Sequence, residues 1–148
     1  MTYTSKHWSV TEWDCLQRSK NPYAWDDENG RLNTNNEKTA NLFRILDLLR
    51  DWNPNWVINW TNSGWKSGYR TSEVNTAVGG TERSNHLYGC AADVHESNTD
   101  ASGEALADAI RAAAEAWGLE NEIELGIYSS GWCHIATPGY YSEYRSEG

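Results

Sequence analysis

The sequence predicts a single α+β domain, in which a small antiparallel sheet is flanked by helices. Its 148 residues are the length of one ordinary domain. Two segments show the three- and four-residue spacing of amphipathic helices, and four short segments have the composition of strands. No repeat or low-complexity tract divides the chain, so we expect residues 1–148 to form one domain.

The N-terminal part carries turn signals without a sustained period. Ser9-Val-Thr-Glu12 has the spacing of a capping box, which predicts a short helical turn. Asn21-Pro22 and Asn29-Gly30 then indicate a loop. Residues 36–52 are predicted to form a helix that Asn53-Pro54 ends. Its apolar face would consist of Leu42, Ile45, Leu46, Leu49 and Trp52.

Most of the sheet is predicted to come from the rest of the chain. Ser129-Ser-Gly131 is expected to join the last two strands in a β-hairpin. A long segment punctuated by glycine and serine follows the first strand, and segments of that length are usually functional or disordered. The strands are expected over residues 56–60, 90–95, 122–128 and 132–136.

A second amphipathic helix is predicted between the second and third strands. Asp100 or Ser102 would cap its start, and Gly118 would end it just after Trp117. Its buried face is expected to contain Leu106, Ile110, Ala113 and Trp117.

The tryptophans are expected mainly in a small aromatic core. Trp65 and Trp132 are also candidates to line a cleft, because flat aromatic walls suit the faces of sugar rings. The residues weighed in this way are Trp8, Trp13, Trp25, Trp56, Trp60, Trp65, Trp117 and Trp132.

Charge and composition argue against several classes of partner. Twelve basic and 21 acidic residues give a net charge of −9, and this field repels nucleic-acid backbones and anionic membranes. No apolar run approaches the length of a membrane span, and the N-terminus lacks the apolar stretch of a signal peptide. We expect a monomer made in the cytoplasm. Cys15, Cys90 and Cys133 are too few and too scattered to form a disulfide framework.

The first candidate metal-binding stretch lies around the second strand. It reads Ser84-Asn-His86-Leu-Tyr-Gly89-Cys-Ala-Ala-Asp93-Val-His95. If residues 90–95 form a strand, Asp93 and His95 lie on one of its faces. Asp93 can then point into the same space as His86 from the preceding loop. A surface histidine followed by an ordinary strand aspartate remains the alternative.

The second candidate stretch contains His134, on the last predicted strand. Cys133 alternates with His134 and faces the other way, which makes it a poor partner in a metal site. A three-residue loop at Ser129–Gly131 would pair Gly126 with His134 and place Glu124 on the same face. A two-residue loop would reverse this arrangement.

Together these stretches resemble the zinc D-Ala-D-Ala carboxypeptidase and endopeptidase family, which has the hedgehog/DD-peptidase fold. The branch of phage and bacterial murein peptidases is the most similar, and the resemblance covers nearly the whole chain. The residues that carry it are Ser67-Gly-Tyr-Arg70, Asn75, Gly79-Gly80, Ser84-x-His86-x-x-Gly89-x-Ala91-x-Asp93 and Trp132-x-His134-Ile.

The resemblance implies that His86, Asp93 and His134 bind zinc. Three protein ligands leave a fourth position for water, as in catalytic zinc sites. Arg70 matches the family arginine that holds a substrate carbonyl or carboxylate, with a structural bridge between loop carbonyls as the alternative. Ser84 matches the serine beside the first ligand and would support the loop or contact substrate.

The general base is where this sequence departs from the family. Many relatives place a carboxylate, or a histidine two residues before the last ligand, beside the zinc-bound water, but this chain has Trp132 at that second position. Glu124, His95 and Glu122 are the remaining candidates, and the face shared with His134 favours Glu124.

The resemblance implies a zinc metallopeptidase that hydrolyses peptide bonds in bacterial peptidoglycan. Its substrate would be a stem peptide or cross-bridge, cut as a D,D- or L,D-carboxypeptidase or endopeptidase. The lack of a signal peptide suits an endolysin that acts during phage lysis, or a wall enzyme carried by the virion. A catalytically idle, zinc-containing module that binds peptidoglycan or peptide, and a dipeptidase acting on free D-Ala-D-Ala, are the alternatives.

Overall fold

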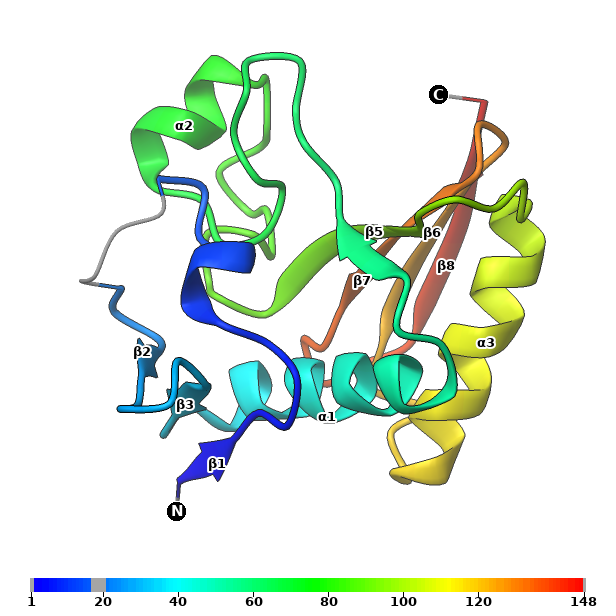
Figure 1. Ribbon diagram of the computed structural model, residues 1–148. Helices are drawn as coiled ribbons and strands as arrows, with labels where there is room; N and C mark the ends of the chain where they lie inside the picture. The colour runs from blue at the N-terminus through cyan, green and yellow to red at the C-terminus, as the bar shows by residue number, and fades with distance from the viewer. Residues whose placement is uncertain (1, 17–20, 148) are drawn as a thin grey trace.

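The computed structural model describes residues 2–16 and 21–147 and contains two sheets in these ranges (Figure 1). The smaller sheet is formed by the N-terminal part, with three antiparallel strands in the order β1-β3-β2. The sequence analysis assigned no strand to this region. Its strands are β1 (Tyr3–Thr4), β2 (Trp25–Asp26) and β3 (Leu32–Thr34).

The larger sheet has five strands in the order β4-β5-β7-β6-β8. Neighbouring strands pair antiparallel except β6 and β8, which run parallel. The expected antiparallel sheet is therefore mixed, because β8, a polar strand not predicted from sequence, joins its edge. The strands are β4 (Trp56–Ile58), β5 (Ala91–Glu96), β6 (Glu124–Tyr128), β7 (Trp132–Ala136) and β8 (Ser142–Ser146).

The two predicted helices are confirmed with small changes at their ends. Helix α1 (Glu37–Trp52) is capped by Asn36, whose side chain accepts a hydrogen bond from the backbone N–H of Thr39. Helix α3 (Gly103–Ala116) is capped by Ser102 rather than Asp100. The predicted capping box is also present, at the short 3₁₀ helix η1 (Val10–Glu12).

The glycine- and serine-punctuated segment after β4 is ordered. It contains the short helix α2 (Ser72–Ala77), capped by Thr71, which the sequence analysis did not predict. In Figure 1, α2 and the loops around it lie on the opposite side of β5 from α1. This segment therefore forms a structured wall above one face of the sheet.

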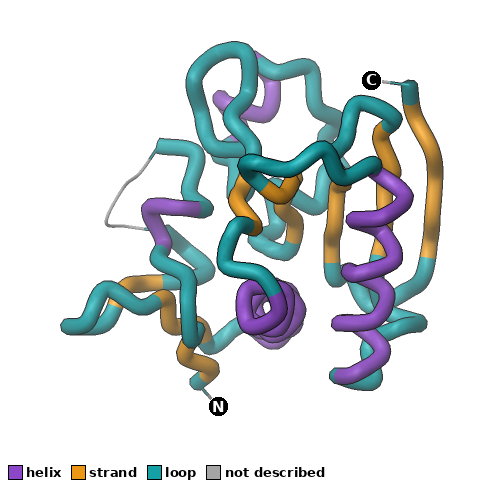
Figure 2. The backbone as a smooth tube through the Cα atoms, turned by 45° about the vertical axis from the view of Figure 1, so that its right-hand side comes forward, coloured by secondary structure: helices purple, strands orange, loops and turns teal. Residues whose placement is uncertain are grey.

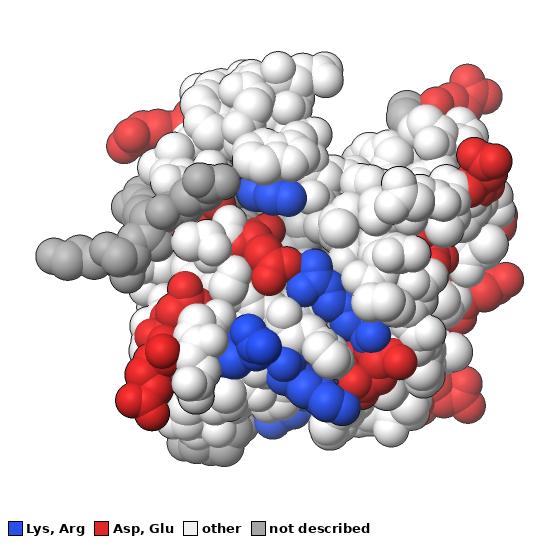
Figure 3. All heavy atoms as spheres, in the orientation of Figure 1, with Lys and Arg blue, Asp and Glu red and all other residues white. Residues whose placement is uncertain are grey.

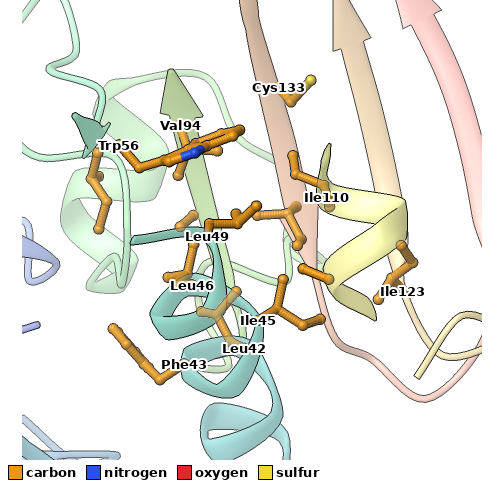
Figure 4. Close-up of a cluster of buried hydrophobic side chains, with 14 of the residues drawn as sticks. Leu42, Phe43, Ile45, Leu46, Leu49, Trp56, Val94, Ile110, Ile123 and Cys133 are labelled. Atoms are coloured by element: carbon orange, nitrogen blue, oxygen red, sulfur yellow. The ribbon is translucent and has the colours of Figure 1, made fainter. Parts of the chain in front are cut away.

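The hydrophobic core lies between the five-stranded sheet and the helices. Figure 2 looks nearly along α1, which lies between the small sheet and α3. Strands β4, β5, β6 and β7 present alternate residues to this core, so Cys133 and Ile135 face inward on β7 while His134 does not. Side chains from both long helices and several strands meet in Figure 4, among them Leu42, Phe43, Ile45, Leu46, Leu49, Trp56, Val94, Ile110 and Ile123.

A buried carboxylate ties the N-terminal segment to α1. Asp47 accepts hydrogen bonds from the Tyr3 hydroxyl at 2.5 Å and the Ser5 hydroxyl at 2.8 Å. The backbone N–H groups of Lys6 and His7 donate to the same carboxylate. Burial, followed by the bond to Asp47, raises the pKa of Tyr3. The donors around Asp47 compensate for its removal from water.

The expected tryptophan core is only partly correct. Trp8, Trp13 and Trp56 are buried, but other tryptophans are exposed, including Trp60 at 57%. Trp117 was expected on the buried face of α3, yet it is 47% exposed because the helix ends there and Trp117 only caps it. The exposed set is Trp25, Trp52, Trp60 and Trp117.

The surface in Figure 3 mixes basic and acidic side chains on one face. The same view shows a hollow at the upper edge, between the part that carries α2 and the part that ends at the C-terminus. Within residues 2–16 and 21–147, no helix has both the length and the hydropathy of a membrane span.

Candidate active site

Three buried side chains with metal-ligating atoms meet above the sheet. His86, Asp93 and His134 each offer one ligand atom, and these atoms all lie within 4.8 Å of one another. Their exposures are only 4%, 7% and 7%. We refer to these three residues as the His–Asp–His cluster.

Strand register explains why the cluster forms. Asp93 on β5 pairs directly with His134 on β7, so both side chains point to the same face. His86 comes from the loop before β5, and its backbone carbonyl accepts from the Arg70 N–H at 3.0 Å. The preceding loop and two strands therefore supply one residue each, as the sequence analysis expected.

The hairpin register places Glu124 next to the cluster. Gly126 pairs with His134, which is the register expected from a three-residue loop. Glu124 lies two residues earlier on β6, and its Oε1 is 2.7 Å from His134 Nε2. Asn85 Nδ2 donates to the same oxygen at 3.3 Å.

Hydrogen bonds fix the orientation of both histidine rings. His86 Nδ1 donates to the Gly68 carbonyl at 2.7 Å, which leaves His86 Nε2 facing Asp93 Oδ1 at 3.4 Å. His134 Nδ1 lies 2.9 Å from the same Asp93 oxygen. The atoms that converge are therefore His86 Nε2, Asp93 Oδ1 and His134 Nδ1.

The second oxygen of Asp93 is held by the Ser67–Arg70 motif. Ser67 Oγ donates to Asp93 Oδ2 at 2.5 Å, and Arg70 Nη2 lies 3.6 Å from that oxygen. Arg70 Nη2 also donates to Ser67 Oγ at 3.1 Å. Gly68 is required between them, because a Cβ there would lie 2.1 Å from the Trp13 carbonyl oxygen. This contact explains the glycine of the motif.

Burial and the neighbouring charges shift the pKa values of all three residues in the cluster. Burial would raise the pKa of Asp93, but the neighbouring His86 and His134 outweigh burial and lower it. Burial would lower the pKa of His134, yet hydrogen bonds to Asp93 and Glu124 outweigh it and raise this pKa to about 9. Burial is also the main influence on His86, whose pKa is lowered. Both nitrogens of His134 contact carboxylates, and these contacts favour the protonated ring.

The cluster opens into a cavity of about 470 Å³, which we call the tyrosine cavity. Arg70, Ser84 and Trp132, the predicted substrate-binding residues, all line it. Glu124 and the three cluster residues also belong to its wall. The remaining residues include Tyr128, Tyr140, Tyr144, Asn85 and Arg83.

Tyr144 is a site residue that sequence reasoning missed. It lies on β8 opposite Gly126, and its ring centroid is 6.2 Å from that of His134. A Cβ on Gly126 would come within 2.6 Å of the Tyr144 ring, so glycine makes room for the tyrosine. Beside Tyr144, the rings of Trp132 and Tyr128 stack with their centroids 3.7 Å apart. The glycine at position 126, inside a predicted strand, was the signal in the sequence that could have pointed to this close approach.

Of the three candidates for the general base, only Glu124 lies beside the cluster. His95 is on β5, but its Nδ1 contacts the Asn59 side chain at 2.5 Å, and it does not line the tyrosine cavity. Burial lowers the pKa of His95. Glu122 precedes β6 and is likewise absent from the cavity wall.

Residues 25–136 match a family described as Peptidase M15. The chain belongs to the peptidase M15 family. The matched segment contains the whole His–Asp–His cluster, so the resemblance seen in the sequence is confirmed at the level of the family. The mixed helices and sheets agree with an M15 peptidase-like fold. No curated protein and no solved structure matches the chain.

M15 peptidases are zinc-dependent, and the donor set of this chain fits zinc. Two imidazoles and one carboxylate are ligands that zinc accepts, and three protein ligands leave room for a water. Each ligand also has an outer partner: Gly68 for His86, Ser67 for Asp93 and Glu124 for His134. Such outer partners orient metal ligands in zinc enzymes. Because it belongs to this family, the chain is a zinc metallopeptidase.

Proposed function

We propose that this zinc metallopeptidase hydrolyses peptide bonds in the stem peptides or cross-bridges of bacterial peptidoglycan. The observation that carries the proposal is a buried His–Asp–His cluster that opens into a cavity, in a chain of the M15 family. The motif shared with murein peptidases supports this substrate class. An endolysin released during phage lysis, or a wall enzyme of the virion, is the corresponding biological setting.

In this proposal His86, Asp93 and His134 hold the zinc ion. When bound, zinc supplies Lewis-acid polarisation of the scissile carbonyl and lowers the pKa of a water to about 7. Metal ligands must be deprotonated, so the Nδ1 proton of His134 is lost on loading. Hydrolysis adds the hydroxyl of one water to the carbonyl carbon and its proton to the leaving nitrogen.

Glu124 is proposed to have two functions. Its Oε1 accepts the Nε2 proton of His134, which keeps His134 Nδ1 directed at Asp93. The carboxylate also lines the tyrosine cavity, so it can take a proton from the attacking water and return it to the leaving nitrogen. The bond to His134, its strongest influence, lowers the pKa of Glu124 and keeps it ionised as a base.

Arg70, Ser84 and Trp132 are proposed to contact the substrate. Arg70 is mostly buried, shares its charge with Asp93 and lines the tyrosine cavity. It can therefore donate to a substrate carbonyl without bringing an unpaired charge into the site. Trp132 offers an aromatic wall next to Tyr128.

The test uses zinc-loaded protein and purified peptidoglycan, with the appearance of new amino groups as the readout. Glu124→Gln keeps an acceptor for His134 but removes the base, so we expect zinc to remain and turnover to fall by about 10²–10⁴-fold. Glu122→Gln, the same change outside the cavity, serves as the matched control.

Each alternative gives a different result in this test. An idle binding module would hold zinc and release no amino groups from any peptide. A dipeptidase would hydrolyse free D-Ala-D-Ala and leave the polymer intact. Unchanged turnover in Glu124→Gln would limit Glu124 to positioning His134.

A further inference from the structure

A second cavity adjoins the tyrosine cavity at the His–Asp–His cluster. It has a volume of about 640 Å³, and we call it the Trp60 cavity. Both cavities are of the size that ligand pockets have in proteins, about 300–1,000 Å³. Arg70, Asp93 and Trp132 line both of them, so the two spaces meet where Asp93 enters the cluster.

Backbone hydrogen bonds connect the wall of the Trp60 cavity to Asp93 of the cluster. The backbone N–H of Asn59 donates to the Asp93 carbonyl at 2.8 Å, and the Asp93 N–H donates to the Ser67 carbonyl at 2.9 Å. These bonds fix the turn between residues 59 and 67 beside Asp93. Trp60 lies on this turn, with Lys66 Nζ 4.5 Å from its ring centroid. Ala77 and Val78, at the end of α2, also line this cavity.

The two cavities differ in charge. Beyond Arg70 and Asp93, the Trp60 cavity is lined by neutral side chains that carry amides or hydroxyls, with apolar surface from Trp60, Ala77 and Val78. The tyrosine cavity contains Arg83 and Glu124 in addition to the cluster. The Trp60 side therefore suits a neutral segment rich in amides and hydroxyls, which Asn and Ser side chains can hydrogen-bond.

An enzyme that removes a terminal residue needs the substrate to end next to the metal site. Here Arg70 and Trp132 line both cavities, so the space continues on both sides of these two residues and neither of them closes it. We infer that this chain is an endopeptidase that holds its substrate on both sides of the cleaved bond, with a neutral segment in the Trp60 cavity. The inference rests on the proposed peptidase function.

The test is digestion of cross-linked peptidoglycan fragments by zinc-loaded protein in heavy-oxygen water, followed by mass spectrometry. Internal cleavage yields two products longer than one residue, and one of them carries heavy oxygen in its new carboxylate. Release of single amino acids as the only small products would overturn the inference, and Arg83 would then be a candidate for binding the terminal carboxylate. Failure to hydrolyse any peptide would instead overturn the proposed function.

Two variants address the Trp60 cavity directly. Ala77→Trp fills it from α2, and Ser63→Trp fills it from the turn between residues 59 and 67. We expect either change to slow internal cleavage at least about tenfold with zinc retained. Ala116→Trp is the matched control, because Ala116 is also an exposed alanine at the last position of a helix. Wild-type rates in both cavity variants would contradict the assignment of this cavity to substrate.

Discussion

The two faces of the five-stranded sheet carry opposite chemistry although the same strands build both. On β7, Cys133 and Ile135 enter the hydrophobic core, while Trp132 and His134 face the cavities. The apolar face is stabilised by hydrophobic contacts, which are non-directional. On the polar face each group depends on a particular partner, as His134 does on Asp93 and Glu124. Stability and metal binding should therefore respond to different residues of one strand.

The largest expected effect is on the polar face. His134→Ala removes a ligand and also leaves Asp93 and Glu124 without their shared partner. Since outer-shell changes alone cost about 10–100-fold in metal affinity, we expect a loss greater than 100-fold and no detectable hydrolysis. Elemental analysis and titration with zinc measure it. His7→Ala, at a histidine bonded to Asp51 far from the cluster in sequence, should bind zinc normally.

The neighbouring position on the apolar face should behave in the opposite way. Ile135 is fully buried, so Ile135→Ala should lower the free energy of unfolding by about 2–5 kcal/mol, and Ile135→Val by about 0.5–1.5 kcal/mol. Urea unfolding measures both changes. One zinc per folded chain is expected in each variant. Loss of zinc at unchanged stability would show that the two faces are not independent.

Gly126→Ala tests how the polar face depends on the close contact between Gly126 and Tyr144. The added Cβ would meet the Tyr144 ring, so the ring must move away from His134. We expect a cost of about 1–3 kcal/mol in unfolding free energy, with reduced turnover. The double variant Gly126→Ala/Tyr144→Ala removes the clash. Its loss of unfolding free energy should therefore be smaller than the sum of the losses in the two single variants. Additive effects would mean that the ring is not held there by Gly126.

The smallest effect concerns Cys90, a buried thiol just before β5. Burial raises the pKa of Cys90 to about 11, from an ordinary value of 9.0. Because the folded state favours the protonated thiol, Cys90 contributes to the free energy of unfolding. This contribution is complete below pH 9 and is lost as the pH rises through about 11. At pH 8 the native thiol should react with iodoacetamide at least about 100-fold more slowly than the unfolded chain. Equal rates would show that the chain at the start of β5 opens readily.

Local patterns in the sequence determined the main parts of the site. Strand alternation placed Asp93 and His134 on faces that can meet, and the family resemblance of the motifs around them implied the ligand set with His86. Two hairpin loop lengths remained open, and the structure has the three-residue loop. Local patterns also determined α1 and α3, whose apolar residues repeat with the helical period. The match to the M15 family covers residues 25–136, which include all of these segments.

Only the tertiary structure decided what surrounds the ligands. The polar strand β8 has no apolar alternation, so nothing in its residues indicated that it would pair with β6 and bring Tyr144 to His134. The exposed position of Trp60 and the junction of the two cavities at Arg70 likewise depend on segments distant in sequence. Sequence periodicity specifies which face a residue occupies, whereas packing between distant segments specifies which residues meet there.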